Sequence, residues 1–173
     1  MDFLTLAKNR FSVRKFQDRP IEKEKLNAIL EAGNLAPTGC NKQPQRILVI
    51  ESEEAREKIK KCTPCHFNAP VVILICADTA SSWVRPYDNK NIAETDAAIV
   101  TTHLMLEAAE QGIGSTWVAC FDPAKVVEEF QVPAHLVPVA LLPIGYPAAD
   151  ALPAPQHNSR APLSETVKFN SFQ

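Results

Sequence analysis

The stretch IAETDAAIVTTHLMLEAAEQ, residues 92–111, is a long helical pattern that ends before Gly112. Its apolar residues, such as Ile99, Val100 and Leu104, fall on most sides of a helix rather than on one stripe. A surface helix needs a polar face. The pattern therefore predicts a helix in the middle of the protein, covered by other elements, and glycine is a common residue just after a helix end.

Shorter patterns on both sides of this helix complete the prediction. Helices are expected over residues 22–36, 53–61 and 123–130, the last with Asp122 as N-cap and Pro123 in its first turn. Extended strands are expected over residues 47–50, 71–77, 116–121 and 136–144. The run 71–77 is apolar throughout, which is typical of a strand covered on both faces. Because Pro138 and Pro143 cannot donate to a ladder, the last strand is expected at an edge or broken.

The composition limits the class of protein. The chain has 173 residues, of which 46% are hydrophobic and 22% charged, so one domain over residues 1–173 is expected. The formal net charge of -2 argues against nucleic-acid binding, which depends on clustered Lys and Arg. No signal peptide is recognisable, and no apolar run is long enough to span a bilayer. With an odd number of cysteines, these features favour a cytoplasmic protein with reduced thiols and no membrane partner.

The chain changes character from Tyr146 onward. Four prolines, at 147, 153, 155 and 162, punctuate a stretch with little periodicity up to Glu165. Such a stretch predicts an extended arm over about 146–173, lying on its own chain or on a partner. The elements together predict an α+β layer structure with a C-terminal arm.

Residues 10–14, RFSVR, are the first candidate for a binding site. On an extended backbone alternate side chains share a face, so Arg10, Ser12 and Arg14 are expected on the same side. Two guanidinium groups and a hydroxyl can clamp a phosphate, because guanidinium forks match phosphate oxygens. An ordinary solvated basic loop is the alternative, and the spacing alone favours that alternative.

Residues 36–44, APTGCNKQP, are the second candidate. They lie between the expected end of a helix and a strand. Their small and amide-bearing side chains offer donors and acceptors without bulk, as the edge of a planar heteroaromatic ring requires. A turn-rich connector is the alternative interpretation.

Taken in order, these segments resemble the nitroreductase-like family of FMN oxidoreductases. That family has an Arg-x-Ser-x-Arg element near its start and a helix ending in Ala-Pro-Ser/Thr-x-x-Asn-x-Gln-Pro, and both match here. Further matches are DAAI at 96–99, EAA at 107–109, GIG at 112–114, FDP at 121–123, GYP at 145–147 and NSRAPL at 158–163. The matches extend over nearly the whole chain.

The resemblance implies a central, mostly antiparallel sheet flanked by helices, in a homodimer that exchanges C-terminal arms and binds FMN at the interface. It implies that the phosphate and ribityl end is held by Arg10, Ser12, Arg14 and Arg160, and that Phe11 and Asn158 also belong to the cofactor-binding residues. It implies contacts to the flavin ring from the partner subunit by Pro37, Thr38, Asn41 and Gln43. The other ring edge is expected beside the backbone of Trp117, Val118, Ala119 and Cys120.

The activity implied is hydride transfer from NAD(P)H to FMN, followed by ping-pong reduction of a nitroaromatic, a quinone or a similar electron-poor acceptor. Because the flavin carries the chemistry, no acid–base residue is assigned, and a backbone amide near Ala119 or Cys120 is the expected partner of flavin N5. Three positions depart from many members: Gln45 replaces Trp, Ala119-Cys120 replaces Glu-Gly, and Asn158 replaces Lys. The first two leave the acceptor open, and the third removes a positive charge near the phosphate.

A competing motif is CTPCH at residues 62–66, which contains a Cys-x-x-Cys spacing. A thioredoxin-like motif opens a helix, whereas here it follows one, so thiol–disulfide exchange by Cys62 and Cys65 is the weaker hypothesis. His66 has no second ligand pair nearby, and no metal site is expected. A flavin-binding module without turnover is the other alternative.

Overall fold

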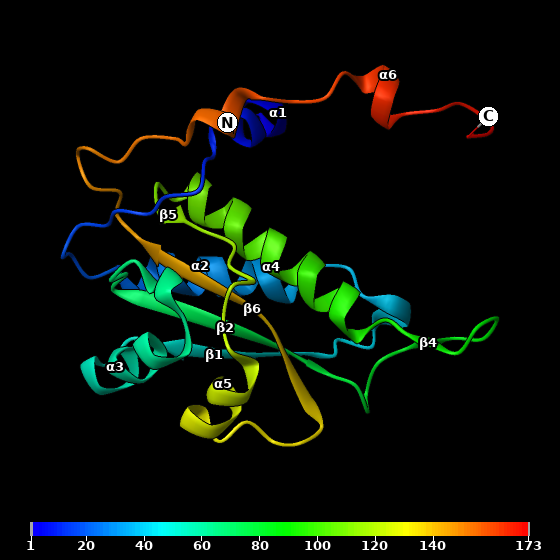
Figure 1. Ribbon diagram of the computed structural model, residues 1–173, viewed down its shortest axis with the longest axis horizontal. Coiled ribbons are helices and arrows are strands. Elements are labelled where there is room, and N and C mark those ends of the chain that lie inside the picture. Colours follow the sequence, from blue (N-terminus) through cyan, green and yellow to red (C-terminus); the bar gives the residue numbers. More distant parts are fainter. Residues whose placement is uncertain (1, 173) are drawn as a thin grey trace.

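A four-stranded sheet forms the centre of the computed structural model, which describes residues 2–172. Its order is β1-β2-β6-β5, with every neighbouring pair antiparallel. The strands are β1 (Gln45–Ile50), β2 (Val71–Asp78), β6 (Leu136–Gly145) and β5 (Gly114–Ser115). A separate hairpin pairs β3 (Val84–Arg85) with β4 (Lys90–Asn91). The predicted mostly antiparallel α+β architecture is confirmed (Figure 1).

Helices cover both faces of this sheet (Figure 1). They are α1 (Phe3–Asn9), α2 (Lys23–Asn34), α3 (Glu53–Cys62), α4 (Ala93–Glu110), α5 (Pro123–Phe130) and α6 (Leu163–Thr166). Short 3-10 turns are η1 (Gly39–Asn41), η2 (Pro64–His66) and η3 (Pro155–Asn158). The helices α2 and α4 pack on one face, and α3 and α5 pack on the other.

The strand β2 is buried along its whole length, as its uninterrupted apolar run predicts. Because side chains alternate, Ile73 and Ile75 join the core beside α4, whereas Val72 and Leu74 join the core beside α3 and α5. The predicted central helix is confirmed as α4, which contributes Val100, Leu104 and Ala108 to the first core.

The expected strand over residues 116–121 is wrong. Regular pairing ends at Ser115, and only Val118 forms a further single bridge, to Leu141. The N-terminal segment takes the place of a strand partner, because Ser115 accepts from the Val13 N–H (2.9 Å) and the Thr116 hydroxyl donates to the Val13 carbonyl. Residues 116–121 therefore form an irregular connection at the sheet edge rather than a strand.

The expectation for the prolines of residues 136–144 is also wrong, because β6 is continuous and lies between β2 and β5. The Pro143 carbonyl accepts from the Thr116 N–H (3.1 Å). The N–H and C=O of one strand residue point to the same side, so the missing Pro143 donor faces the short β5 rather than β2. Pro138 lies where the register with β2 shifts by one residue, and such a bulge relaxes the demand for a donor.

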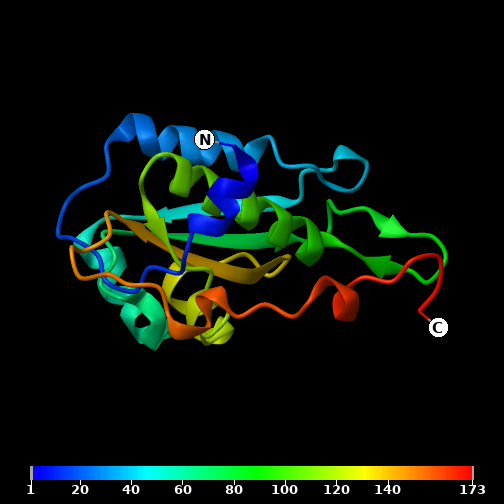
Figure 2. The same ribbon diagram turned by 90° about the horizontal axis from the view of Figure 1, so that it is seen from above.

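Residues 146–172 form the expected extended arm, which runs along the length of the molecule (Figure 2). The arm contacts α1 and the residues after it through His157, because a His157 ring nitrogen lies 3.1 Å from the Lys8 carbonyl oxygen and the His157 ring packs edge-on against Phe11. Farther along, the apolar side chains of Leu163 and Phe169 are exposed. No helix within residues 2–172 is long and apolar enough to cross a membrane.

A polar cluster ties the end of β6 to the start of α2. The Tyr146 hydroxyl donates to Glu22 (2.5 Å) and accepts from Lys25 (3.0 Å), while Arg19 donates to Glu22 (2.7 Å) and lies over the Tyr146 ring. The hydrogen bond from Tyr146, then one from the Glu22 backbone, with a smaller contribution from Arg19, lowers the pKa of Glu22 from 4.5 to about 2.

This shift predicts part of the acid sensitivity of the fold. Because the pKa of Glu22 is lower in the folded chain, its contribution is complete above pH 4.5 and is lost as the pH falls toward about 2. Replacing Tyr146 by Phe removes the main cause of the shift. Urea denaturation measures the free energy of unfolding at each pH. As the pH is lowered over this range, we expect this free energy to fall less steeply for Tyr146→Phe than for the original chain. Glu22→Gln should flatten the curve likewise, and curves parallel to that of the original chain would contradict the assignment.

Candidate functional site

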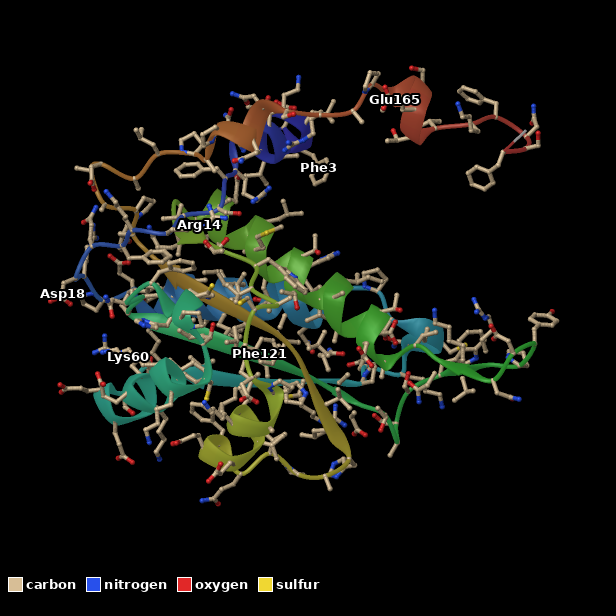
Figure 3. All side chains as sticks on the ribbon, in the orientation of Figure 1. Phe3, Arg14, Asp18, Lys60, Phe121 and Glu165 are labelled. Carbon is tan, nitrogen blue, oxygen red and sulfur yellow. The ribbon has the colours of Figure 1, made fainter. Side chains whose placement is uncertain are left out.

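The RFSVR segment leaves α1 and runs beside β5. Ser12 forms a parallel bridge to Ser115, which together with the bonds of Val13 fixes the backbone of this segment at the sheet edge. Arg14 is exposed and donates to the Ser12 carbonyl (3.2 Å). Figure 3 shows Arg14 close to the C-terminal end of α4, which leads into β5.

The positive charges of Arg10 and Arg160 repel one another, although the residues are 150 positions apart in the chain. Burial, and then the positive charge of Arg160, lowers the pKa of Arg10. Within residues 2–172, Arg160 donates only to carbonyls of its own turn, those of Ser159 (2.9 Å) and Gln156 (3.4 Å). Neither arginine forms an ion pair with an acidic side chain in this part of the chain, and two such cations are suited to a bound anion.

A cavity of about 180 Å³ lies between α1, this segment and the C-terminal end of α4. Arg10, Phe11 and Ser115 line it. The Ser115 hydroxyl is buried and has no hydrogen-bond partner within residues 2–172. A buried unpaired hydroxyl beside a cation fits a phosphate oxygen or another polar ligand group. The sequence does not predict Ser115 as a site residue, because the neighbouring residues 112–114 indicate only the end of the preceding helix.

The second predicted segment forms a tight loop around η1. Cys40, Asn41 and Gln43 have positive φ values of 49°, 52° and 49°. The Thr38 hydroxyl accepts from the Gln43 N–H (3.0 Å), and the Asn41 side chain accepts from the Gln43 amide (3.2 Å). The exposed amide groups of this loop are therefore held in a defined arrangement.

Asp96 in the first turn of α4 anchors this loop. Its Oδ1 accepts from the Gly39 N–H (3.0 Å), and Asp96 is only 2% exposed. Its Oδ2 is buried without a partner within residues 2–172. The sequence alone does not predict this role of Asp96, because its partner Gly39 lies 57 positions away in the chain.

Removing this anchor should loosen the loop. We expect Asp96→Ala to lower the free energy of unfolding by about 1.5–3 kcal/mol, because a buried hydrogen bond to a charged group is lost. Asp96→Asn keeps an oxygen for Gly39 and should cost less. Hydrogen exchange should show a faster Gly39 amide in Asp96→Ala only, whereas equal exchange in both variants would contradict the role of Asp96.

The two predicted segments lie at opposite ends of α4. The loop at residues 38–43 contacts the first turn of this helix, whereas Arg10 and Phe11 line the cavity at its last turn. A helix of 18 residues is about 27 Å long, at about 1.5 Å per residue. FMN is shorter than this, so the structure does not bring both segments of one chain to the same FMN.

Residues 117–120 leave the sheet toward α5. Val118 is buried, and its N–H and C=O both bond to Leu141 (2.9 and 3.0 Å). Trp117 is half-buried against the core beside α4. Ala119 and Cys120 are exposed, and their N–H groups donate to no residue within 2–172. The Trp117 N–H also donates to no residue within 2–172, but Trp117 is half-buried, so Ala119 and Cys120 are the exposed residues of this segment with free backbone donors.

The remaining predicted residues divide between these places. Phe11 packs against His157, Pro37 lies between α2 and the loop, and Asn158 ends η3 two residues before Arg160. No group of three or more His, Cys, Asp or Glu side chains within residues 2–172 is placed to hold a metal ion.

Comparison with known proteins agrees with this geometry. The family model described as the nitroreductase family matches residues 7–66 and 60–146. A protein of Methanothermobacter thermautotrophicus named as an NADH dehydrogenase/NAD(P)H nitroreductase is 31% identical over 86% of this chain and 78% of its own.

Two solved structures extend the likeness. A nitroreductase family protein from Clostridium difficile 630 is 42% identical, with a TM-score of 0.93 over 99% of both chains. An FMN-dependent nitroreductase from Clostridium difficile R20291 is 27% identical, with a TM-score of 0.79 over 98% of this chain and 100% of its own. The antiparallel α+β core is thus that of a known fold, and the chain belongs to the nitroreductase family.

Proposed function

We propose that this chain is an FMN-dependent NAD(P)H oxidoreductase that binds each FMN between two copies of itself. The observation that carries the proposal is the position of the two candidate segments at opposite ends of α4. One chain cannot bring both to a single FMN, but two chains packed with α4 running in opposite directions can. The FMN dependence and the NAD(P)H donor follow the relatives named above.

The phosphate end of FMN is assigned to one chain. Arg10, Arg14 and Arg160 supply positive charge, Ser12 supplies a hydroxyl, and Asn158 and Phe11 shape the site beside His157. To this predicted set we add Ser115, whose hydroxyl lacks another partner. A bound phosphate would offset the repulsion between Arg10 and Arg160.

The flavin ring is assigned to both chains. Pro37, Thr38, Asn41 and Gln43 of the second copy would contact it, and their loop is already held by Asp96. Trp117, Val118, Ala119 and Cys120 of the first copy would pass its other edge. Because Val118 uses its own N–H in the sheet, the N–H of Ala119 or Cys120 is the donor assigned to flavin N5.

The arm supports a dimer of whole chains, each acting as one domain. Beyond its attachment at His157, the arm exposes Leu163 (77%) and Phe169 (85%), and α1 exposes Phe3 (64%) and Leu4 (67%). Apolar side chains left uncovered together are typical of a protein–protein interface. We assign the arm to the surface of the partner copy.

FMN held by these residues would supply the redox chemistry, which is hydride acceptance from NAD(P)H and electron transfer to an acceptor in a ping-pong cycle. The chain binds the phosphate, orients the ring and donates a hydrogen bond near N5. Nitroaromatics, quinones and similar electron-poor molecules are the proposed acceptors. No side chain of the site is needed as a general acid or base in the hydride step.

Anaerobic mixing of the FMN-loaded protein with NADH or NADPH tests the activity. Loss of the oxidised flavin absorbance, and its return on adding a quinone or a nitroaromatic, is expected. A yellow protein that neither nucleotide bleaches would instead be a flavin-binding module without turnover. A colourless protein that takes up no added FMN would overturn the cofactor assignment itself.

A further inference from the structure

Three of the five cysteines come together on the side of the molecule where residues 119–121 meet η2. Cys62 and Cys120 line the same open groove, of about 520 Å³. Cys65 lies three residues after Cys62, in η2, and packs against the same core. The sequence brings only Cys62 and Cys65 together, and Cys120 joins them through the fold.

Hydrogen bonds hold Cys65 and Cys120 side by side. The Cys65 N–H donates to the Thr63 hydroxyl (3.0 Å), and that hydroxyl donates to the Cys120 carbonyl. The Asp122 N–H donates to the Cys62 carbonyl (2.8 Å), which adds a second link between the two segments. The Cys65 and Cys120 side chains are close enough to interact, since Cys120 contributes to the raised pKa of Cys65.

Cys62 has a different environment. It is 3% exposed, and its thiol donates back to the Lys58 carbonyl (3.4 Å) in α3. Although Cys62 and Cys65 form the Cys-x-x-Cys motif, the thiol that acts on the pKa of Cys65 is that of Cys120.

We propose that Cys65 and Cys120 form a reversible disulfide when the protein meets a hydroperoxide. Cys120 is exposed and Cys65 is half-buried, so the oxidant reaches Cys120 first. The Cys120 thiol takes an oxygen atom from the hydroperoxide, giving a sulfenic acid and an alcohol, or water when the oxidant is hydrogen peroxide. The Cys65 thiol then attacks the Cys120 sulfur, and the hydroxyl leaves as water as the S–S bond forms.

Both steps suit the positions of the two residues. Burial, and then the nearby Cys120, raises the pKa of Cys65, which disfavours its thiolate and makes Cys65 the less reactive of the two thiols toward the oxidant. A resolving thiol already in contact with the sulfenic acid captures it before a second oxidant can. A dithiol reductant reverses the bond. The disulfide depends on no bound flavin, so the proposal stands or fails separately from the proposed function.

Peptide mapping tests the proposal. The reduced protein is treated with hydrogen peroxide or with diamide, the remaining thiols are alkylated, and the digest is analysed by mass spectrometry. We expect one linked peptide pair that contains Cys65 and Cys120 and disappears after dithiothreitol. Cys62→Ser is the matched control and should give the same pair, whereas Cys65→Ser and Cys120→Ser should each abolish it.

Two results would overturn the proposal. A link between Cys62 and Cys65 would mean that the sequence motif, and not the fold, determines the pairing. Sulfinic acid at Cys120 with Cys65 still free would mean that the two thiols do not meet. The map is scored on protein with and without FMN, so a protein that fails to bind flavin still gives a result.

Discussion

Arg10→Ala will yield a protein that folds but retains little or no FMN. Arg10 lies half-buried at the cavity beside α1, where burial and the charge of Arg160 already disfavour its own positive charge. A phosphate is the partner that would offset this cost. A hydrogen bond to a charged group contributes about 1.5–3 kcal/mol, which corresponds to a loss of affinity of about tenfold or more.

Lys8→Ala is the matched control. Lys8 is exposed in the last turn of α1, two residues from Arg10, so the substitution removes the same charge from the same helix end. FMN content is measured by absorbance after denaturation, and the dissociation constant is measured by fluorescence titration. Full loading of Arg10→Ala, or equal losses in both variants, would refute the phosphate assignment.

Mixing two defective chains tests whether the site is shared between copies. A chain with Arg10→Ala keeps the loop at residues 38–43 that is assigned to the flavin ring. A chain with Thr38→Trp keeps the arginines that are assigned to the phosphate. A mixed dimer therefore has one intact site and one site with both defects. We expect co-expression to restore FMN to about half of the sites in such mixed dimers, while each variant alone stays empty. If each chain built its own site, no mixture would regain FMN.

Leu104→Ala is expected to give the largest loss of stability. Leu104 is fully buried in α4, and it packs against α2 at Gly33. Truncating a buried leucine costs about 2–5 kcal/mol, part of it for the cavity that remains. Urea denaturation measures the loss. Thr102→Ala on the exposed side of the same helix should change the free energy of unfolding by less than about 0.5 kcal/mol.

The contact with Gly33 makes this prediction sharper. A Cβ atom at Gly33 would lie 2.6 Å from Leu104 Cδ2, so Gly33→Ala alone should destabilise by about 1–3 kcal/mol despite the better helix propensity of alanine. In the double variant the new methyl group enters the space that Leu104 vacates. The combined loss should fall short of the sum by more than about 0.5 kcal/mol, and strict additivity would show that the two side chains do not compete for space.

Local chemistry made several elements predictable. Asp122 and Pro123 mark the start of α5, and the apolar run at residues 71–77 gives β2, because capping and alternation act between neighbours in the chain. The strand predicted after Ser115 failed for the opposite reason. The Ser115 carbonyl and the Thr116 hydroxyl bond to Val13, which lies about a hundred residues earlier and leaves no signal beside them in the sequence.

The candidate site shows the same division. The sequence by itself determined the residue types: the arginines and serine of residues 10–14, the amides of residues 38–43, and the family to which they belong. Only the tertiary structure decided that these segments lie at opposite ends of α4. It also decided that Arg160 interacts with Arg10, and that Cys65 interacts with Cys120 rather than with Cys62. Residue types and local periodicity are properties of the chain, whereas distances between remote residues are fixed only when the helices and strands pack around one core.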